Sequence, residues 1–185
     1  WSILCPALIA GLIVAASHVP LGVQVLRKGI VFIDLAIAQI AGFGVVAADA
    51  FGFESGVMVQ GSALAAAILG AVVLTWTEKK FPDVQEAIIG VSFVLAATAA
   101  LILLSSNPHG AEHMKDILVG QILWVNPSEL WLQGAISAIV LIVWIALGER
   151  ISRVGFYVLF ACAVTMSVQL IGIYLVFATL IIPAL

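Results

Sequence analysis

Charged residues are scarce in this chain: Asp, Glu, Lys and Arg make up 9% of its 185 residues, against about a quarter of an average soluble domain. Hydrophobic residues make up 64% of the sequence, and the mean hydropathy is +1.26. A soluble domain of this length could not enclose so much apolar surface. With no basic patch, nucleic acid is not an expected partner. We therefore expect an all-α polytopic membrane protein.

Two other features that carry chemistry are also missing. Cys5 and Cys162 lie in apolar stretches, without the spacing of a zinc site, so they are expected to be small buried hydrophobic residues, not a disulfide. Lys79 and Lys80 are not preceded by the glycine-rich loop that cradles phosphates. The chain itself is therefore not expected to bind ATP or to be an enzyme.

Six apolar stretches are present, each close to the roughly 20 helical residues needed to cross a bilayer. They cover residues 3–26, 30–53, 57–77, 87–105, 130–147 and 155–185. Short connections and the lack of an internal repeat predict one transmembrane domain over residues 1–185. The last stretch would be about 46 Å long as a straight helix, so breaks are expected at Gly172 and Pro183.

The basic residues give an orientation for these six crossings. Six of them fall in three loops that share one side: Arg27, Lys28, Lys79, Lys80, Arg150 and Arg153, whereas the other side has only Lys115. Short cytoplasmic loops are enriched in Lys and Arg. The loop with Arg27 and Lys28 is therefore predicted to be cytoplasmic.

The second stretch contains the polar residues Asp34 and Gln39. A charge at the bilayer centre costs about 2.5–3.5 kcal/mol even on the most permissive scales, so such groups normally face a protein interior or an aqueous path. One interpretation is that this helix lines the route of a polar solute. The other is that Asp34 reaches water from a helix end while Gln39 bonds to a neighbouring helix.

The longest connection, residues 106–129, has a second group of candidate ligands: His109, Glu112, His113 and Asp116. Histidine and carboxylate groups suit zinc, manganese or iron. The same spacing also arises on a solvated loop, so a surface or docking face is the competing interpretation.

Two further features are expected to serve packing. Ser62, Ala66 and Gly70 form a stripe of small residues that allows close helix contact. His18 stands near Pro20 and is interpreted as a hydrogen-bonded residue beside a helix kink, with a place on a solute route as the alternative.

Three stretches together resemble the permease subunit of metal-type ABC importers, the family that takes up zinc, manganese or iron. Residues 20–44, PLGVQVLRKGIVFIDLAIAQIAGFG, are similar to its pattern of Pro-Leu-Gly, a basic pair, Phe-Gly-Asp, a histidine four residues later and a glycine. Residues 88–130 resemble its fourth helix and outer helix, with GQIL before a proline. Residues 168–184, VQLIGIYLVFATLIIPA, resemble its C-terminal signature.

This resemblance implies a homodimeric permease in the bacterial cytoplasmic membrane. It implies cytoplasmic ATP-binding subunits as partners and an extracytoplasmic protein that delivers the metal ion, a substrate and not a bound cofactor. Asp34 matches the family's aspartate, a candidate metal ligand.

The chain departs from the family in three ways. The family's histidine falls on Ala38 when aligned from Asp34, or on Gln39 when aligned from Gly44, so the Asp–His pair is missing. The cytoplasmic stretch at residues 148–153 is shorter than usual, and the family usually continues beyond the Ile-x-Pro-Ala signature. We expect the sequence to be part of a longer chain.

The function expected on these grounds is the permease of an ATP-driven importer for zinc, manganese or iron ions. Two alternatives stay open: an ABC permease for a metal chelate of siderophore or cobalamin type, and a carrier or channel driven by an ion gradient.

Overall fold

The computed structural model describes residues 4–53, 56–105, 115, 118–120, 122–124 and 127–185. The described residues form six long helices: α1 (Leu4–Lys28), α2 (Ile33–Ala50), α3 (Gly56–Lys80), α4 (Gln85–Leu104), α6 (Pro127–Leu147) and α7 (Arg153–Ile181). Short 3-10 helices occur at Pro82–Val84, Ile122–Trp124, Gly148–Arg150 and Ile182–Ala184. The predicted all-helical membrane fold is confirmed, since five helices are long and apolar enough to cross a membrane and α6 has a shorter apolar stretch.

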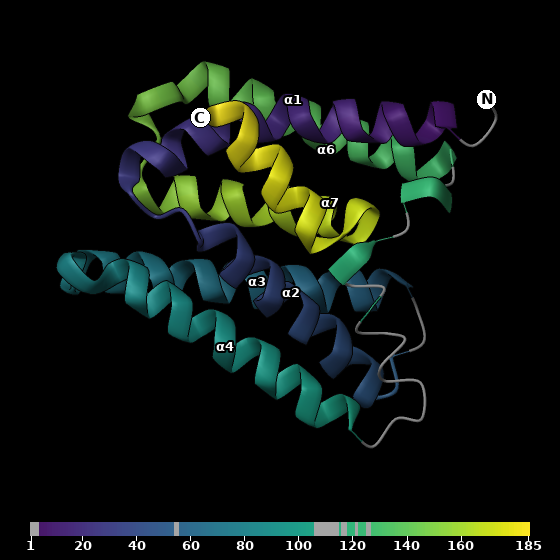
Figure 1. The fold of residues 1–185 in the computed structure, drawn as a ribbon, viewed down its shortest axis with the longest axis horizontal. Coiled ribbons are helices and arrows are strands. Elements are labelled where there is room, and N and C mark those ends of the chain that lie inside the picture. Colours follow the sequence, from purple (N-terminus) through teal and green to yellow (C-terminus); the bar gives the residue numbers. More distant parts are fainter. Residues whose placement is uncertain (1–3, 54–55, 106–114, 116–117, 121, 125–126) are drawn as a thin grey trace.

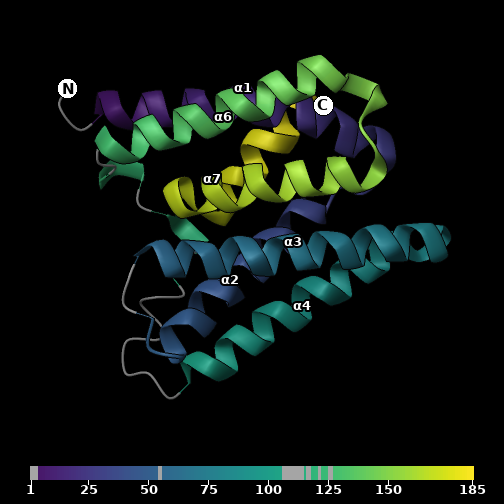
Figure 2. The ribbon, with the colours of Figure 1, turned by 180° about the vertical axis from the view of Figure 1, so that it is seen from behind.

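The helices lie in two groups that α7 connects (Figures 1 and 2). One group is α1, α6 and α7, and the other is α2, α3 and α4. Helix α7 packs against α1 and α6 in its own group and against α2 and α3 in the other. Its central place follows from its sequence, because it is apolar around most of its circumference and largely buried.

Helix α7 breaks at Gly172, as expected from the sequence, and then runs back along the molecule. Gly172 has φ 78° and ψ 164°, a conformation outside the helical region. Near the start of α7, the Phe156 ring centroid is 5.4 Å from Lys28 Nζ. Near its end, Leu180 contacts Gly22 so closely that a Cβ on Gly22 would lie 2.0 Å from the Leu180 carbonyl oxygen. A straight helix of this length would span about 44 Å, so its ends meet the same part of α1 because the chain reverses at Gly172 (Figure 1).

The reversal is covered by the segment that follows the undescribed residues 116–117. Gly120, with φ 70°, lies against Gly172, and a Cβ on Gly172 would lie 2.3 Å from the Val119 carbonyl carbon. Glycine permits both the positive φ and this close approach of two backbones. The contact therefore fixes residues 118–120 on the tip of the α7 reversal.

The predicted small-residue stripe on α3 is confirmed as a packing surface for α2. A Cβ on Gly44 would lie 2.7 Å from the Ser62 carbonyl oxygen and 2.9 Å from Ala66 Cβ. The side chain of Ile40 packs closely on Gly70, where an added Cβ would lie 2.7 Å from Ile40 Cδ1. Small residues on both helices thus allow α2 and α3 to approach closely.

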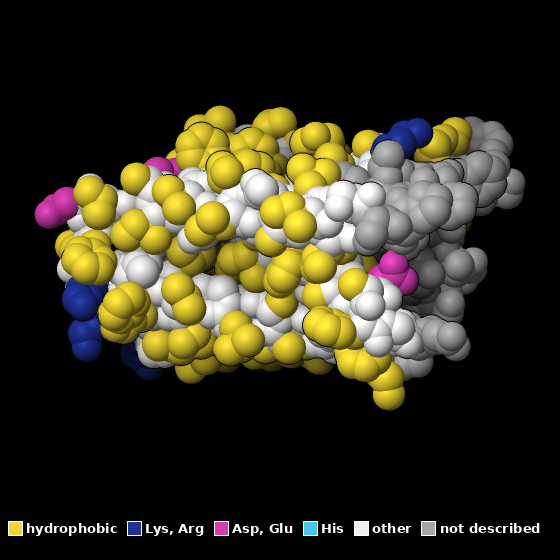
Figure 3. Space-filling model, turned by 90° about the horizontal axis from the view of Figure 1, so that it is seen from below, with side chains coloured by type: hydrophobic (Ala, Val, Ile, Leu, Met, Phe, Trp, Pro, Cys, Tyr) yellow, Lys and Arg dark blue, Asp and Glu magenta, His cyan; other side chains and the backbone are white. Residues whose placement is uncertain are grey.

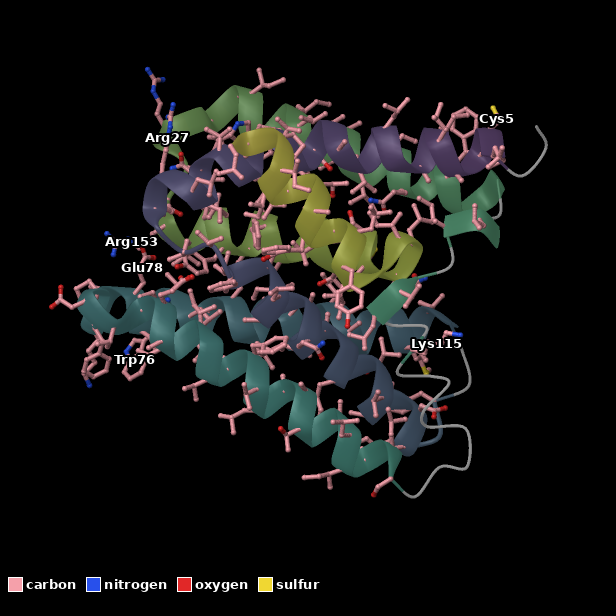
Figure 4. All side chains as sticks on the ribbon, in the orientation of Figure 1. Cys5, Arg27, Trp76, Glu78, Lys115 and Arg153 are labelled. Atoms are coloured by element: carbon pink, nitrogen blue, oxygen red, sulfur yellow. The ribbon has the colours of Figure 1, made fainter. Side chains whose placement is uncertain are left out.

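The long sides of the molecule are apolar and its ends are polar, as Figure 3 shows for one side. Large hydrophobic side chains such as Leu69 and Ile142 are exposed there. Cys5 is also exposed, which corrects the expectation of a buried thiol, because the first turns of α1 face outward. Arg27 and Arg153 lie at one end, called here the basic end, and Lys115 lies at the other (Figure 4).

Candidate functional site

Asp34 lies in the first turn of α2 and is 1% exposed. The helix begins at Ile33, three residues later than the predicted span, because Gly29 has φ 68° and the chain turns before it. Both carboxylate oxygens lack a hydrogen-bond partner in the described part of the chain. Asp34 is thus near a helix end, as one sequence interpretation proposed, yet it does not reach water.

Gln39, the second polar residue predicted in this helix, is 4% exposed. It is five residues after Asp34, so the two side chains leave the helix about 140° apart. Ala38, which shares the helix face of Asp34, is 1% exposed, and its methyl side chain has no atom that could bind a metal ion. The structure therefore buries both predicted residues without placing them on one face.

A second carboxylate approaches the start of α2 from α4. Glu86 Oε1 accepts a hydrogen bond from the Phe32 N–H, with a donor–acceptor distance of 3.2 Å. Glu86 Oε2 is buried and has no hydrogen-bond partner among the described residues. Glu86 thus lies at the start of α2, two residues along the chain from Asp34 through its contact with Phe32.

Glu86 was not predicted as a site residue, because the candidates were polar residues within the apolar stretches and Glu86 lies outside them. A usable signal was present, since Glu86 stands directly before the fourth stretch, as Asp34 stands near the start of the second. Because both helices start at the basic end, their first turns could be expected to meet once α2 and α4 were known to pack.

Polar contacts also join the helices at the basic end, where Glu78 lies (Figure 4). Lys28 Nζ at the end of α1 is 3.7 Å from Glu78 Oε1 near the end of α3. Thr77 donates to Gln85 Oε1 at 3.0 Å, and Gln85 Nε2 donates to the Leu74 carbonyl at 3.0 Å. These contacts tie α1, α3 and α4 together and leave Asp34 outside the network.

His18 of α1 is fully buried in the group of helices formed by α1, α6 and α7. Its Nδ1 is 2.9 Å from the Val14 carbonyl oxygen, which can only accept, so Nδ1 carries the proton. This is the hydrogen bond that the structural interpretation predicted. Ser17 beside it contacts Ser137 of α6 at 3.4 Å, and Gln133 of α6 donates to Ser167 of α7 at 3.0 Å. These polar residues join α1, α6 and α7.

The other predicted metal ligands lie outside the described residues: His109, Glu112, His113 and Asp116. Within the part that the structure describes, no three or more His, Cys, Asp or Glu residues come together to hold a metal ion. Of the predicted site residues, Asp34 and Gln39 are the ones that the structure describes, and both are buried.

Comparison with known families gives one match that covers most of the chain. The model of the family described as "ABC 3 transport family" matches residues 1–152. The match includes Asp34, Gln39 and Glu86.

Three curated proteins are similar to the chain. A membrane protein of Synechocystis is 23% identical over 96% of this chain and 69% of its own length. A protein of Chlamydia trachomatis named "Probable metal transport system membrane protein" is 26% identical over 73% of this chain and 47% of its own length. A protein of Chlamydia muridarum with the same name is 24% identical over 75% of this chain and 48% of its own length. The chain spans about half the length of the two Chlamydia proteins.

Two solved structures have a similar fold. PsaBC from Streptococcus pneumoniae, solved with a Fab, superposes with a TM-score of 0.75 at 19% identity, covering 98% of this chain and 70% of the other. An inward-facing transporter assigned to the metal-chelate ABC type superposes with a TM-score of 0.73 at 15% identity, covering 97% and 73%. At these identities the likeness shows the fold alone.

Proposed function

Because the chain belongs to the ABC 3 transport family, we propose that it is the permease of an ATP-driven importer for a divalent transition metal ion. The ion would be zinc, manganese or iron, handed over by an extracytoplasmic binding protein. One observation carries this proposal: Asp34, buried in a membrane helix, has two carboxylate oxygens without a hydrogen-bond partner among the described residues.

A buried carboxylate without a partner is expensive, because water no longer solvates its charge. A permanent salt bridge would remove that cost but would also remove the attraction for a passing ion. An ionised Asp34, buried at the start of α2, would be a site of negative charge that attracts a dication. This is the arrangement expected along a cation route.

In the proposed mechanism, the binding protein docks at the end that carries Lys115 and releases the ion. The ion would then pass the first turn of α2, where Asp34 offers oxygen ligands, and leave at the basic end, which its Lys and Arg residues predict to face the cytoplasm. Two permease chains and two ATP-binding subunits would form the working complex. The 3-10 helix Gly148–Arg150 at the basic end is one surface that an ATP-binding subunit could contact.

A metal-chelate importer is the second candidate, supported by the fold it shares with the inward-facing transporter. A bare ion needs charged oxygen ligands, whereas a chelate already carries its ligands and needs a wide binding surface. The buried carboxylate of Asp34 favours the bare ion. An ion-gradient carrier is less well supported, because the family match is to an ABC transport family.

The test is co-purification of the full-length permease with the products of its neighbouring genes, followed by metal analysis. Recovery of an ATPase and of a bound divalent transition metal supports the proposal. A complex without an ATPase would contradict it, and a chelate in place of a free ion would favour the second candidate.

A further inference from the structure

One exposed face of α3 changes from apolar to charged as the helix reaches the basic end. Leu69, Val73 and Trp76 are each more than half exposed, and Lys80, the last residue of the helix, is exposed as well. Spacings of four, three and four residues place these side chains on one face. Figure 4 shows Trp76 at the same end of the molecule as Arg153. Lys80 therefore lies where an apolar outer surface ends.

Two aromatic rings hold the ammonium group of Lys80 at this border. Its Nζ is 5.0 Å from the centroid of the Trp76 ring and 5.4 Å from that of the Phe81 ring. At such distances the ring face attracts a cation. The backbone of Phe81 is itself fixed, because its N–H donates to the Thr77 carbonyl oxygen at 2.7 Å. Lys80 is thus ordered at the surface, and among the described residues it forms no ion pair.

The simplest alternative is that Lys80 only complements the dipole of α3. The C-terminus of a helix is equivalent to roughly half a negative charge, and Lys79 in the same turn already supplies one positive charge. Glu78 is paired with Lys28 at 3.7 Å. Asp83 follows in the next 3-10 helix, is exposed, and makes no ion pair with Lys80. The dipole therefore does not account for the second lysine and its two rings.

We infer that the end of α3 binds the headgroup of an anionic phospholipid, with Lys80 contacting the phosphate. Ammonium and phosphate groups form charge-assisted hydrogen bonds, and basic residues next to a membrane span attract anionic lipids. The Trp76 ring suits the headgroup level, where tryptophan is enriched. Because the two rings already order Lys80, binding costs it less conformational freedom than it would cost a mobile lysine.

The apolar face before Lys80 favours a lipid over a protein partner. Leu69 and Val73 lie deeper along the span Val57–Lys80, where acyl chains would cover them. A cytoplasmic protein could reach Lys80 but not these two residues. One lipid molecule can contact the whole face, with its phosphate at Lys80 and its chains along α3.

The test is quenching of Trp76 fluorescence by brominated phospholipids. Full-length permease with Trp76 kept as its only tryptophan is placed in bilayers that contain brominated phosphatidylglycerol or brominated phosphatidylcholine. The protein with Lys80 should prefer phosphatidylglycerol by about fivefold, which corresponds to the effect of one lysine near an anionic surface. Lys80→Met should abolish this preference and Lys80→Arg should keep it. Phe81→Leu should lower it by about twofold or more, because Lys80 would then have to be ordered on binding.

Arg150→Met is the matched control, since it removes one positive charge from the same end but from the turn between α6 and α7. It should keep the preference measured at Trp76. Equal quenching by the two lipids in the protein with Lys80 would overturn the inference, and so would equal losses in Arg150→Met and Lys80→Met, which would indicate a diffuse attraction to the basic end. A loss of preference in Lys80→Arg would contradict the role of the charge.

Two additions to the same assay test the identity of the ligand. Free glycerol phosphate should not displace the lipid, because it lacks the chains that lie along α3; displacement at a concentration similar to that of the lipid would contradict the assignment to a lipid. Addition of the ATP-binding subunit should leave Trp76 open to quenching. Protection of Trp76 from both brominated lipids would instead assign this surface to the protein partner and overturn the inference.

Discussion

Replacing Gly172 by Ala should strongly destabilise the protein, because the substitution acts on the point where α7 reverses. Gly172 has φ 78° and ψ 164°, a region that only glycine enters freely, and a side chain there costs about 1–3 kcal/mol. The added Cβ would also lie 2.3 Å from the Val119 carbonyl carbon and 2.4 Å from the Gly120 nitrogen. Backbone atoms cannot move aside as a flexible side chain can, and overpacking of this kind costs about 1–3 kcal/mol more.

The sum, about 2–6 kcal/mol, corresponds to a fall in Tm of roughly 4–24 °C for a chain of this size, at about 2–4 °C per kcal/mol. Thermal unfolding of the detergent-solubilised protein, followed by circular dichroism, measures it. Gly90→Ala is the matched control: Gly90 is inside α4 and a Cβ there would meet nothing within 4 Å. That substitution should stabilise the helix by about 0.5–1 kcal/mol. Equal Tm values for the two variants would refute the reasoning about the reversal.

Two further predictions concern helix contacts. Gly44→Ala should lower the Tm and reduce the free energy of unfolding by about 1–3 kcal/mol, because the new Cβ would lie 2.7 Å from the Ser62 carbonyl oxygen. Gly61→Ala is the control, since a Cβ on Gly61 would meet nothing within 4 Å. An equal fall in Tm for both variants would contradict the close contact of α2 and α3. Lys28→Met should lower the free energy of unfolding by about 1 kcal/mol, because Glu78 loses the ammonium group 3.7 Å away. Chemical denaturation in detergent measures this change, and no difference from wild type would show that the ion pair contributes nothing to stability.

The helices could be predicted because each is an apolar stretch of nearly bilayer length, and lipid leaves a backbone few alternatives to the helix. The break at Gly172 could be predicted for a related reason: the last stretch was too long for one crossing. The direction of the chain after Gly172 could not be predicted, because it depends on contacts such as Gly22 with Leu180 that hydropathy does not encode.

The site was predictable only in part. Asp34 and Gln39 were recognised as polar residues in an apolar stretch, but the position of Asp34 in the first turn depends on where the turn at Gly29 ends. Glu86 was missed because its closeness to Asp34 follows from the packing of α2 against α4. Periodicity within one helix does not show which residues of another helix will face it.

The most direct test of the transport function is metal uptake by proteoliposomes that contain the full-length permease, its ATPase partner and the binding protein. Mn²⁺ and Zn²⁺ would be measured with wild type, Asp34→Asn and Asp49→Asn, the last being an exposed carboxylate near the other end of α2. We predict ATP-dependent uptake by wild type and Asp49→Asn, and its loss in Asp34→Asn complexes that still assemble. Uptake by Asp34→Asn at the wild-type rate would contradict the role of this buried carboxylate.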